Sequence, residues 1–187
     1  ESLINQVKAD RRLSERQMEI LRKIEAEHDD GAMAERAKWV EGYKNDPTLR
    51  ADAIVVAHYY KTTGYFGSTA DAVINEEQFV PTYSQYNKMV KNKYAQKVLS
   101  AHNDKPKYEK GQLVTFRAAA PAAQRRCGDG YLKPAVTMMV IAADAAPVTS
   151  AARGAKKYKL LPVGKAETLI VEERYIMKAR KLGSAKK

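Results

Sequence analysis

The hydrophobic period of the chain changes within residues 105–121, KPKYEKGQLVTFRAAAP, and this change limits the possible folds more than any other feature. Before this segment, apolar residues recur at the three- to four-residue spacing of amphipathic helices. After Gly111 the side chains of QLVTFRA alternate between apolar and polar, which is the period of a half-buried strand. A helical half followed by a strand-rich half predicts an α+β chain.

The helical half contains one well-marked helix start. Ser14 is placed as the N-cap residue and Gln17 as its capping-box partner, with Leu13 and Met18 spaced as a hydrophobic staple. A helix should therefore begin directly after Ser14. Further helices are predicted at residues 33–43, 49–62, 68–74 and 82–101.

The last of these segments has the strongest helical pattern. Its apolar stripe repeats every four residues at Tyr86, Val90, Tyr94 and Val98. Lysines occupy the remaining faces, so one continuous helix with a cationic surface is predicted.

Five short apolar segments follow, separated by turn residues and without long helices between them. They are residues 111–118, 135–142, 156–163, 168–173 and 175–178. This pattern is typical of a small antiparallel barrel. We therefore predict a helical domain at 1–103, a β-barrel at 107–181 and a basic tail at 182–187.

The net charge of +11 is distributed unevenly. Residues 1–80 contain 11 lysine and arginine residues and 15 acidic residues, whereas residues 81–187 contain 22 basic and 7 acidic residues. Such an asymmetry creates a field that attracts polyanions. A surface that merely keeps the protein in solution is the alternative explanation.

Candidate contacts to a phosphate backbone lie in the helix at 82–101, in the RRCGDGY loop and in ARGAKKYK. They are Lys88, Lys91, Lys93, Lys97, Arg125, Arg126, Arg153, Lys156, Lys157, Tyr158 and Lys159. The ARGAKKYK segment combines four cations with Tyr158 as a stacking surface, which suits a backbone clamp. The alternative is that Lys157 and Lys159 form the solvent face of an edge strand, where lysine hinders aggregation.

The sequence does not favour an enzyme. The three histidines lie in different predicted elements without metal-ligand spacing, and Cys127 is the only cysteine. No phosphate-binding glycine loop or nucleophile-elbow motif is present in the sequence. We predict no catalytic residue, no metal and no cofactor.

No apolar run approaches the roughly 20 residues needed to cross a bilayer, which predicts a soluble protein without a membrane partner. The single Cys127 excludes an internal disulfide and fits a reducing compartment, so we expect a cytoplasmic location. Because the chain begins with Glu1, we expect it to be a fragment or a processed product.

Two segments resemble known families. The strand after Gly111 and the closing segment ETLIVEERYIMKAR resemble the SH3-like barrels of KOW and Tudor modules. Residues 2–17, SLINQVKADRRLSERQ, are similar to a segment of tailed-bacteriophage proteins of DNA metabolism, and the matching positions are Ser2, Leu3, Leu13, Ser14 and Gln17. The second resemblance implies a phage origin and a place in the infected bacterial cytoplasm, and it transfers no catalytic residue.

Two functional hypotheses follow from these observations. The first is a phage accessory protein that binds DNA or RNA through its phosphate backbone, using the basic second half of the chain. The second is a protein-interaction module that docks on a phage or host complex, such as a polymerase or a virion component. Acidic protein surfaces would attract the same lysines.

Overall fold

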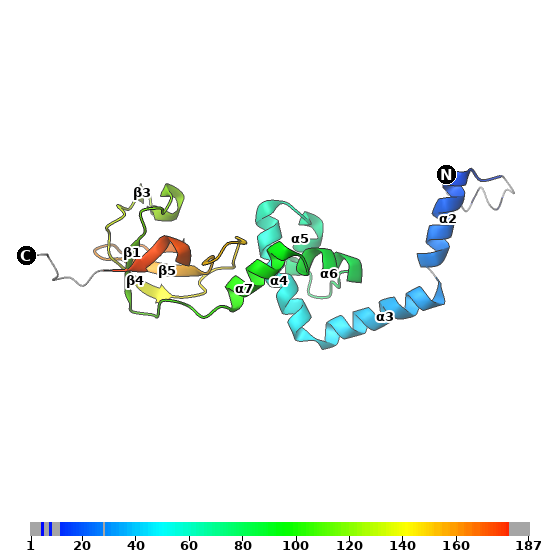
Figure 1. Ribbon diagram of the computed structural model, residues 1–187, viewed down its shortest axis with the longest axis horizontal. Coiled ribbons are helices and arrows are strands. Elements are labelled where there is room, and N and C mark those ends of the chain that lie inside the picture. Colours follow the sequence, from blue (N-terminus) through cyan, green and yellow to red (C-terminus); the bar gives the residue numbers. More distant parts are fainter. Residues whose placement is uncertain (1–4, 6–7, 9–11, 28, 180–187) are drawn as a thin grey trace, which may run out of the picture. The chain divides into compact units, whose positions relative to one another are not determined.

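The computed structural model describes residues 5, 8, 12–27 and 29–179 (Figure 1). The predicted basic tail at 182–187, together with Ser2 and Leu3, lies outside the described residues. The chain divides into two compact units, Glu1–Pro47 and Thr48–Lys187.

The first unit contains helices α2, Glu15–Glu27, and α3, Asp30–Asn45. The predicted capping box of α2 is confirmed, because the Ser14 N–H donates to Gln17 Oε1 at 2.9 Å and the Gln17 N–H donates to Ser14 Oγ at 3.3 Å. In α3, Tyr43 is buried and its ring lies 5.7 Å from that of Trp39.

The second unit begins with four helices, α4 (Pro47–Thr63), α5 (Gly67–Asn75), α6 (Tyr83–Val90) and α7 (Lys93–Asn103). The continuous helix predicted at 82–101 is therefore wrong. The helix ends at Val90, and Asn92 starts a new one, because its side-chain oxygen accepts from the backbone N–H groups of Tyr94 and Ala95 and caps α7. Its amide also donates to the Tyr60 hydroxyl at 2.6 Å. With the helix interrupted, Tyr94 is 49% exposed instead of lying on a buried stripe.

A five-stranded antiparallel sheet follows the helices. Its strands are β1 (Leu113–Phe116), β4 (Met138–Ala142), β5 (Lys157–Pro162), β6 (Leu169–Glu172) and β7 (Ile176–Lys178), in the order β6-β5-β4-β1-β7. Each of the five predicted segments contains one of these strands. A short hairpin, β2 (Arg126–Cys127) with β3 (Gly130–Tyr131), lies between β1 and β4 in the chain.

The sheet is strongly curved. Its edge strands, β6 and β7, are connected only by the 3₁₀ turn η2, Glu173–Tyr175. In a flat sheet the two edges would lie about 19 Å apart, at about 4.8 Å per strand. A three-residue 3₁₀ turn spans roughly 6–8 Å. The sheet must therefore bend until its two edges approach each other at this end.

The concave face of the sheet encloses an apolar core. Val114, Phe116, Val140, Tyr158 and Leu160 are all buried in it. The alternation along β5 directs Tyr158 and Leu160 inward and leaves Lys159 exposed.

Helix α7 packs against the loop that precedes β5. Val98 and Ala101 of the helix form a buried cluster with Val148 and Ala155. The Lys156 ammonium also donates to the backbone oxygen of His102 at 2.9 Å, at the end of the helix. Among the described helices, none has the length and apolar character required for a membrane span.

Candidate anion-binding site

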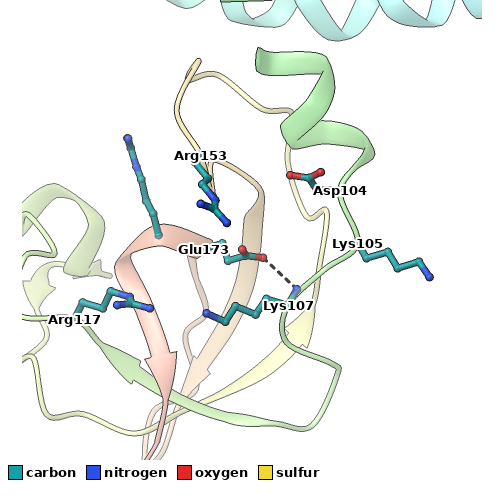
Figure 2. A pocket seen from close by; sticks show the side chains of 8 residues that line it. Asp104, Lys105, Lys107, Arg117, Arg153 and Glu173 are labelled. Atoms are coloured by element: carbon teal, nitrogen blue, oxygen red, sulfur yellow. Dashed lines mark hydrogen bonds between the residues drawn. The ribbon is translucent and has the colours of Figure 1, made fainter. Parts of the chain in front are cut away.

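An open cleft of about 590 Å³ lies at one end of the sheet (Figure 2). The chain reaches it directly after α7, after β1, before β5 and in η2. Five basic and two acidic residues surround it. The lining residues are Asp104, Lys105, Lys107, Arg117, Arg153, Gly154, Glu173 and Arg174. The excess of positive charge makes this cleft a candidate site for an anion.

Arg117 is held in position by the end of the sheet. Its backbone N–H donates to the Tyr175 oxygen at 2.8 Å, and its side-chain Nε donates to the Ile176 oxygen at 2.9 Å. These two bonds fix the base of the guanidinium group while the residue as a whole stays exposed. Its outer nitrogens are thus oriented without a large loss of side-chain freedom when an anion binds.

Arg174 is ordered by different contacts. Its Nε lies 2.6 Å from the carboxylate of the buried Glu172, and its guanidinium carbon lies 4.7 Å from the centre of the Tyr175 ring. Glu172 therefore balances part of this positive charge. Arg174 contributes less to the field of the cleft than its formal charge suggests.

Glu173 is the acidic residue at the centre of the cleft. Its carboxylate accepts from the Tyr158 hydroxyl at 2.8 Å and from the Lys107 backbone N–H at 3.2 Å. Figure 2 shows Glu173 between Lys107 and Arg153, with its carboxylate directed to the Lys107 backbone. Burial, followed by the contact with Glu173, raises the pKa of Tyr158, so its hydroxyl is protonated at neutral pH and donates to this carboxylate.

The loop that carries Arg153 approaches η2 closely at Gly154. The Arg174 N–H donates to the Gly154 oxygen at 2.9 Å, and Gly154 has a φ of +71°. A Cβ at this position would lie 3.2 Å from the Arg174 backbone nitrogen. A residue with a Cβ would therefore be strained here on two grounds, the positive φ and the close approach of Arg174. Arg153, the neighbour of Gly154, lines the cleft.

Two predicted contact residues lie in the core, and their assignment to a binding surface is corrected. Lys156 is 3% exposed, and its ammonium pairs with Asp144 and the His102 oxygen. Tyr158 is fully buried, and its hydroxyl is used by Glu173 and by the Lys107 and Tyr108 N–H groups. Neither side chain can reach a phosphate or stack on a base from this position.

The other residues of the β5 region have separate environments. Arg153 lines the cleft, and Lys159 is exposed on β5. Lys157 is half-buried and donates to Thr149 Oγ1 at 2.8 Å, and burial lowers the pKa of its ammonium group. Because β5 lies between β4 and β6, the interpretation of an edge strand is wrong.

The remaining predicted residues do not line the cleft. Arg125 is half-buried and donates to the Leu132 oxygen at 2.8 Å, whereas Arg126 is exposed on β2. The four lysines of the α6–α7 region are exposed. They are Lys88, Lys91, Lys93 and Lys97.

Sequence reasoning missed most of the cleft. Lys105, Lys107, Arg117 and Arg174 were not predicted, because they lie in three separate segments of the chain and form no local cluster. The available signal was weak: Arg174 lies between two predicted strands, Arg117 lies near the end of another, and Lys105 and Lys107 lie in the linker before it.

The described residues contain no group of three or more histidine, cysteine, aspartate or glutamate side chains placed to hold a metal ion. Neither protein-family models nor curated proteins nor solved structures give a match to this chain.

Proposed function

We propose that this protein binds nucleic acid through its phosphate backbone, with the cationic cleft as the contact site. The observation that carries the proposal is that Lys107, Arg117 and Arg153 line one cleft, in which the Glu173 carboxylate is already engaged by internal donors. Arginine side chains bind phosphate oxygens in a bidentate manner, and a fixed guanidinium does so at a low entropic cost.

We also propose that the curved sheet is a barrel of the SH3-like kind. The strand order β6-β5-β4-β1-β7 supports it, because the last strand returns to pair with the first. The 3₁₀ turn between the two edge strands supports it as well. In this arrangement the loops at one end of the barrel form the cleft.

The phage origin and the place in an infected bacterium belong to the same proposal. They depend on the sequence resemblance of residues 2–17, and of the segment from YYKTTGYF through NKYAQKVLSAH, to phage proteins. The role that they suggest is that of a non-catalytic accessory protein that binds DNA or RNA. Its binding would have little sequence preference, because phosphate contacts carry no base information.

The experiment is a salt titration of binding to a single-stranded oligonucleotide, followed by fluorescence anisotropy between 50 and 200 mM salt. With about four phosphate contacts, the log–log slope should be about −3. The double variant Arg153→Gln/Lys107→Gln should flatten the slope by about 1.4, because each lost contact to a single strand removes about 0.7. The backbone N–H of Lys107 still donates to Glu173 in this variant.

The matched control is Lys133→Gln/Lys165→Gln, which removes the same charge from exposed residues outside the cleft. Its slope should stay close to that of the unchanged protein. Equal slopes for the two double variants would show that only net charge matters and would refute the cleft as the site. Absence of salt-dependent binding to any nucleic acid, together with capture of a specific phage or host protein, would favour the protein-interaction alternative.

A further inference from the structure

A second hollow, of about 380 Å³, lies in the same compact unit and has a different chemistry. Its walls are mostly apolar and come from α4, from the end of α7 and from the loop after β4. The lining residues are Ile54, Val55, His58, His102, Asp144, Ala145, Ala146, Pro147 and Val148. Concave sites with apolar walls and a few polar groups are typical of sites for small organic groups.

The polar groups of this pocket offer both donors and acceptors. Burial lowers the pKa of His58, and the nearby charges of Lys61 and Lys157 act in the same direction. The imidazole is therefore neutral at pH 7 and presents one donor and one acceptor. Asp144 adds a carboxylate: one oxygen, Oδ1, pairs with Lys156, and the side chain is 48% exposed.

The pocket and the cationic cleft share two segments of chain. His102 lines the pocket, and Asp104 and Lys105 line the cleft directly after it. The second segment is residues 153–156. Arg153 and Gly154 line the cleft. Two residues further on, Lys156 binds two pocket residues, through the Asp144 carboxylate and the His102 oxygen. Lys156 thereby holds two pocket residues next to the segment that enters the cleft.

We infer that the pocket between α4, the end of α7 and residues 144–148 receives one unstacked nucleobase of a strand whose phosphates lie in the cleft. This inference rests on the proposed function. The apolar walls would contact the ring faces, and the His58 imidazole and the Asp144 carboxylate would face the mixed donor and acceptor edge of the base. A paired base cannot enter such a pocket without leaving the duplex, so the site selects single strands.

The test compares three labelled probes at constant salt: a single-stranded 12-mer, the same backbone with abasic residues throughout, and the duplex. The unchanged protein should bind the single strand about tenfold more tightly than the abasic strand, because an inserted base adds stacking that phosphates cannot supply. All three probes should show a steep dependence on salt.

Ala146→Leu fills the pocket without changing charge. It should bring the ratio between the normal and abasic strands to about one and leave the salt slope unchanged. Ala123→Leu is the matched control, since Ala123 is exposed and lies outside both hollows, and it should keep the tenfold ratio.

A second pair of variants addresses the polar edge in case Ala146→Leu perturbs folding. His58→Leu should lower the ratio between normal and abasic strands, and His58→Gln should restore part of it, because the glutamine amide again offers a donor and an acceptor. Circular dichroism and a thermal melt establish that each variant is folded.

The outcomes separate the two proposals. Equal binding of the normal and abasic strands by the unchanged protein, with a steep salt dependence, would overturn the base pocket and leave the phosphate-binding cleft standing. A tenfold ratio that survives both Ala146→Leu and His58→Leu would place the base elsewhere and also overturn the inference. Failure to bind any of the three probes would overturn the proposed function itself.

Discussion

The ammonium group of Lys156 forms an ion pair with the carboxylate of Asp144, in which the lysine side chain is 4% exposed and the aspartate side chain is 48% exposed. The same ammonium group donates to the His102 oxygen at the end of α7. One buried charge thus connects the loop after β4, the start of β5 and the last turn of a helix. The pair is asymmetric, because solvent reaches Asp144 and hardly reaches Lys156.

Replacing Lys156 with methionine should destabilise the protein. Methionine fills the space of the lysine stem but cannot donate to Asp144 or to the His102 oxygen. We expect the free energy of unfolding in urea to fall by about 1–3 kcal/mol. Lys159→Met, at an exposed position on the adjoining strand β5, is the control and should change it by less than about 0.5 kcal/mol. Equal effects of the two substitutions would contradict a structural role for the buried lysine.

Gly154→Ala should cost more than Gly164→Ala. Both glycines have a positive φ, +71° and +79°, so both alanines carry a similar backbone strain of about 1 kcal/mol. Only at Gly154 would the new Cβ meet neighbouring atoms, the Arg174 nitrogen and Cβ, each at 3.2 Å. We expect an additional loss of about 1 kcal/mol in chemical unfolding. If the two variants unfold at the same urea concentration, the loop and η2 are not in close contact.

The two functions of Asn92 can be separated by two substitutions. Asn92→Ala removes the cap of α7 together with the hydrogen bond to the Tyr60 hydroxyl, and should cost about 1–2 kcal/mol. Asn92→Asp keeps the capping oxygen and places a favourable negative charge at a helix N-terminus. We expect the aspartate variant to have a higher melting temperature than the alanine variant. The reverse order would show that the amide donor matters more than the cap.

Stability should depend on pH through His58. Because burial lowers its pKa in the folded state, the unfolded chain binds more protons between that lowered pKa and about 6.5. The free energy of unfolding is therefore highest, as far as His58 is concerned, above pH 6.5. It decreases as the pH falls from 6.5 through the pKa of His58 in the folded state. In His58→Gln, unfolding free energies measured in urea from pH 5 to 8 should vary less with pH than in the unchanged protein. An identical pH profile for both proteins would show that His58 is not responsible.

Limited proteolysis distinguishes two ways of dividing the chain. The sequence predicts a helical domain ending at 103 and a barrel beginning at 107, which would favour cleavage between them. In the structure the boundary between the compact units falls between Pro47 and Thr48 along the chain, and Lys156 binds α7 to the segment before β5. We expect the first stable fragment, identified by mass spectrometry, to begin near residue 48 and to include both α7 and the sheet. Early cleavage at 102–110 that leaves two resistant fragments would support the sequence-based division instead.

The sequence by itself determined the features that depend on neighbouring residues. Ser14 and Gln17 lie within one helical turn, so their spacing was enough to predict the capping box that starts α2. The change to alternating side chains located all five strands of the sheet, because this period follows from the geometry of a single strand. The interruption at Asn92 was not predicted, because the four-residue apolar repeat continues across it.

Only the tertiary structure decided which charged residues face solvent and which of them meet. Lys156 directly precedes β5 and is buried like Tyr158 and Leu160 of that strand. A charge count cannot show that Asp144 and the His102 oxygen are placed to accept from its ammonium group. The residues of the cationic cleft come from four segments of the chain. Of its basic residues, only Arg153 was predicted from the sequence. Their proximity results from the curvature of the sheet and from the short turn between its edge strands, and these long-range relationships leave no periodic trace in the sequence.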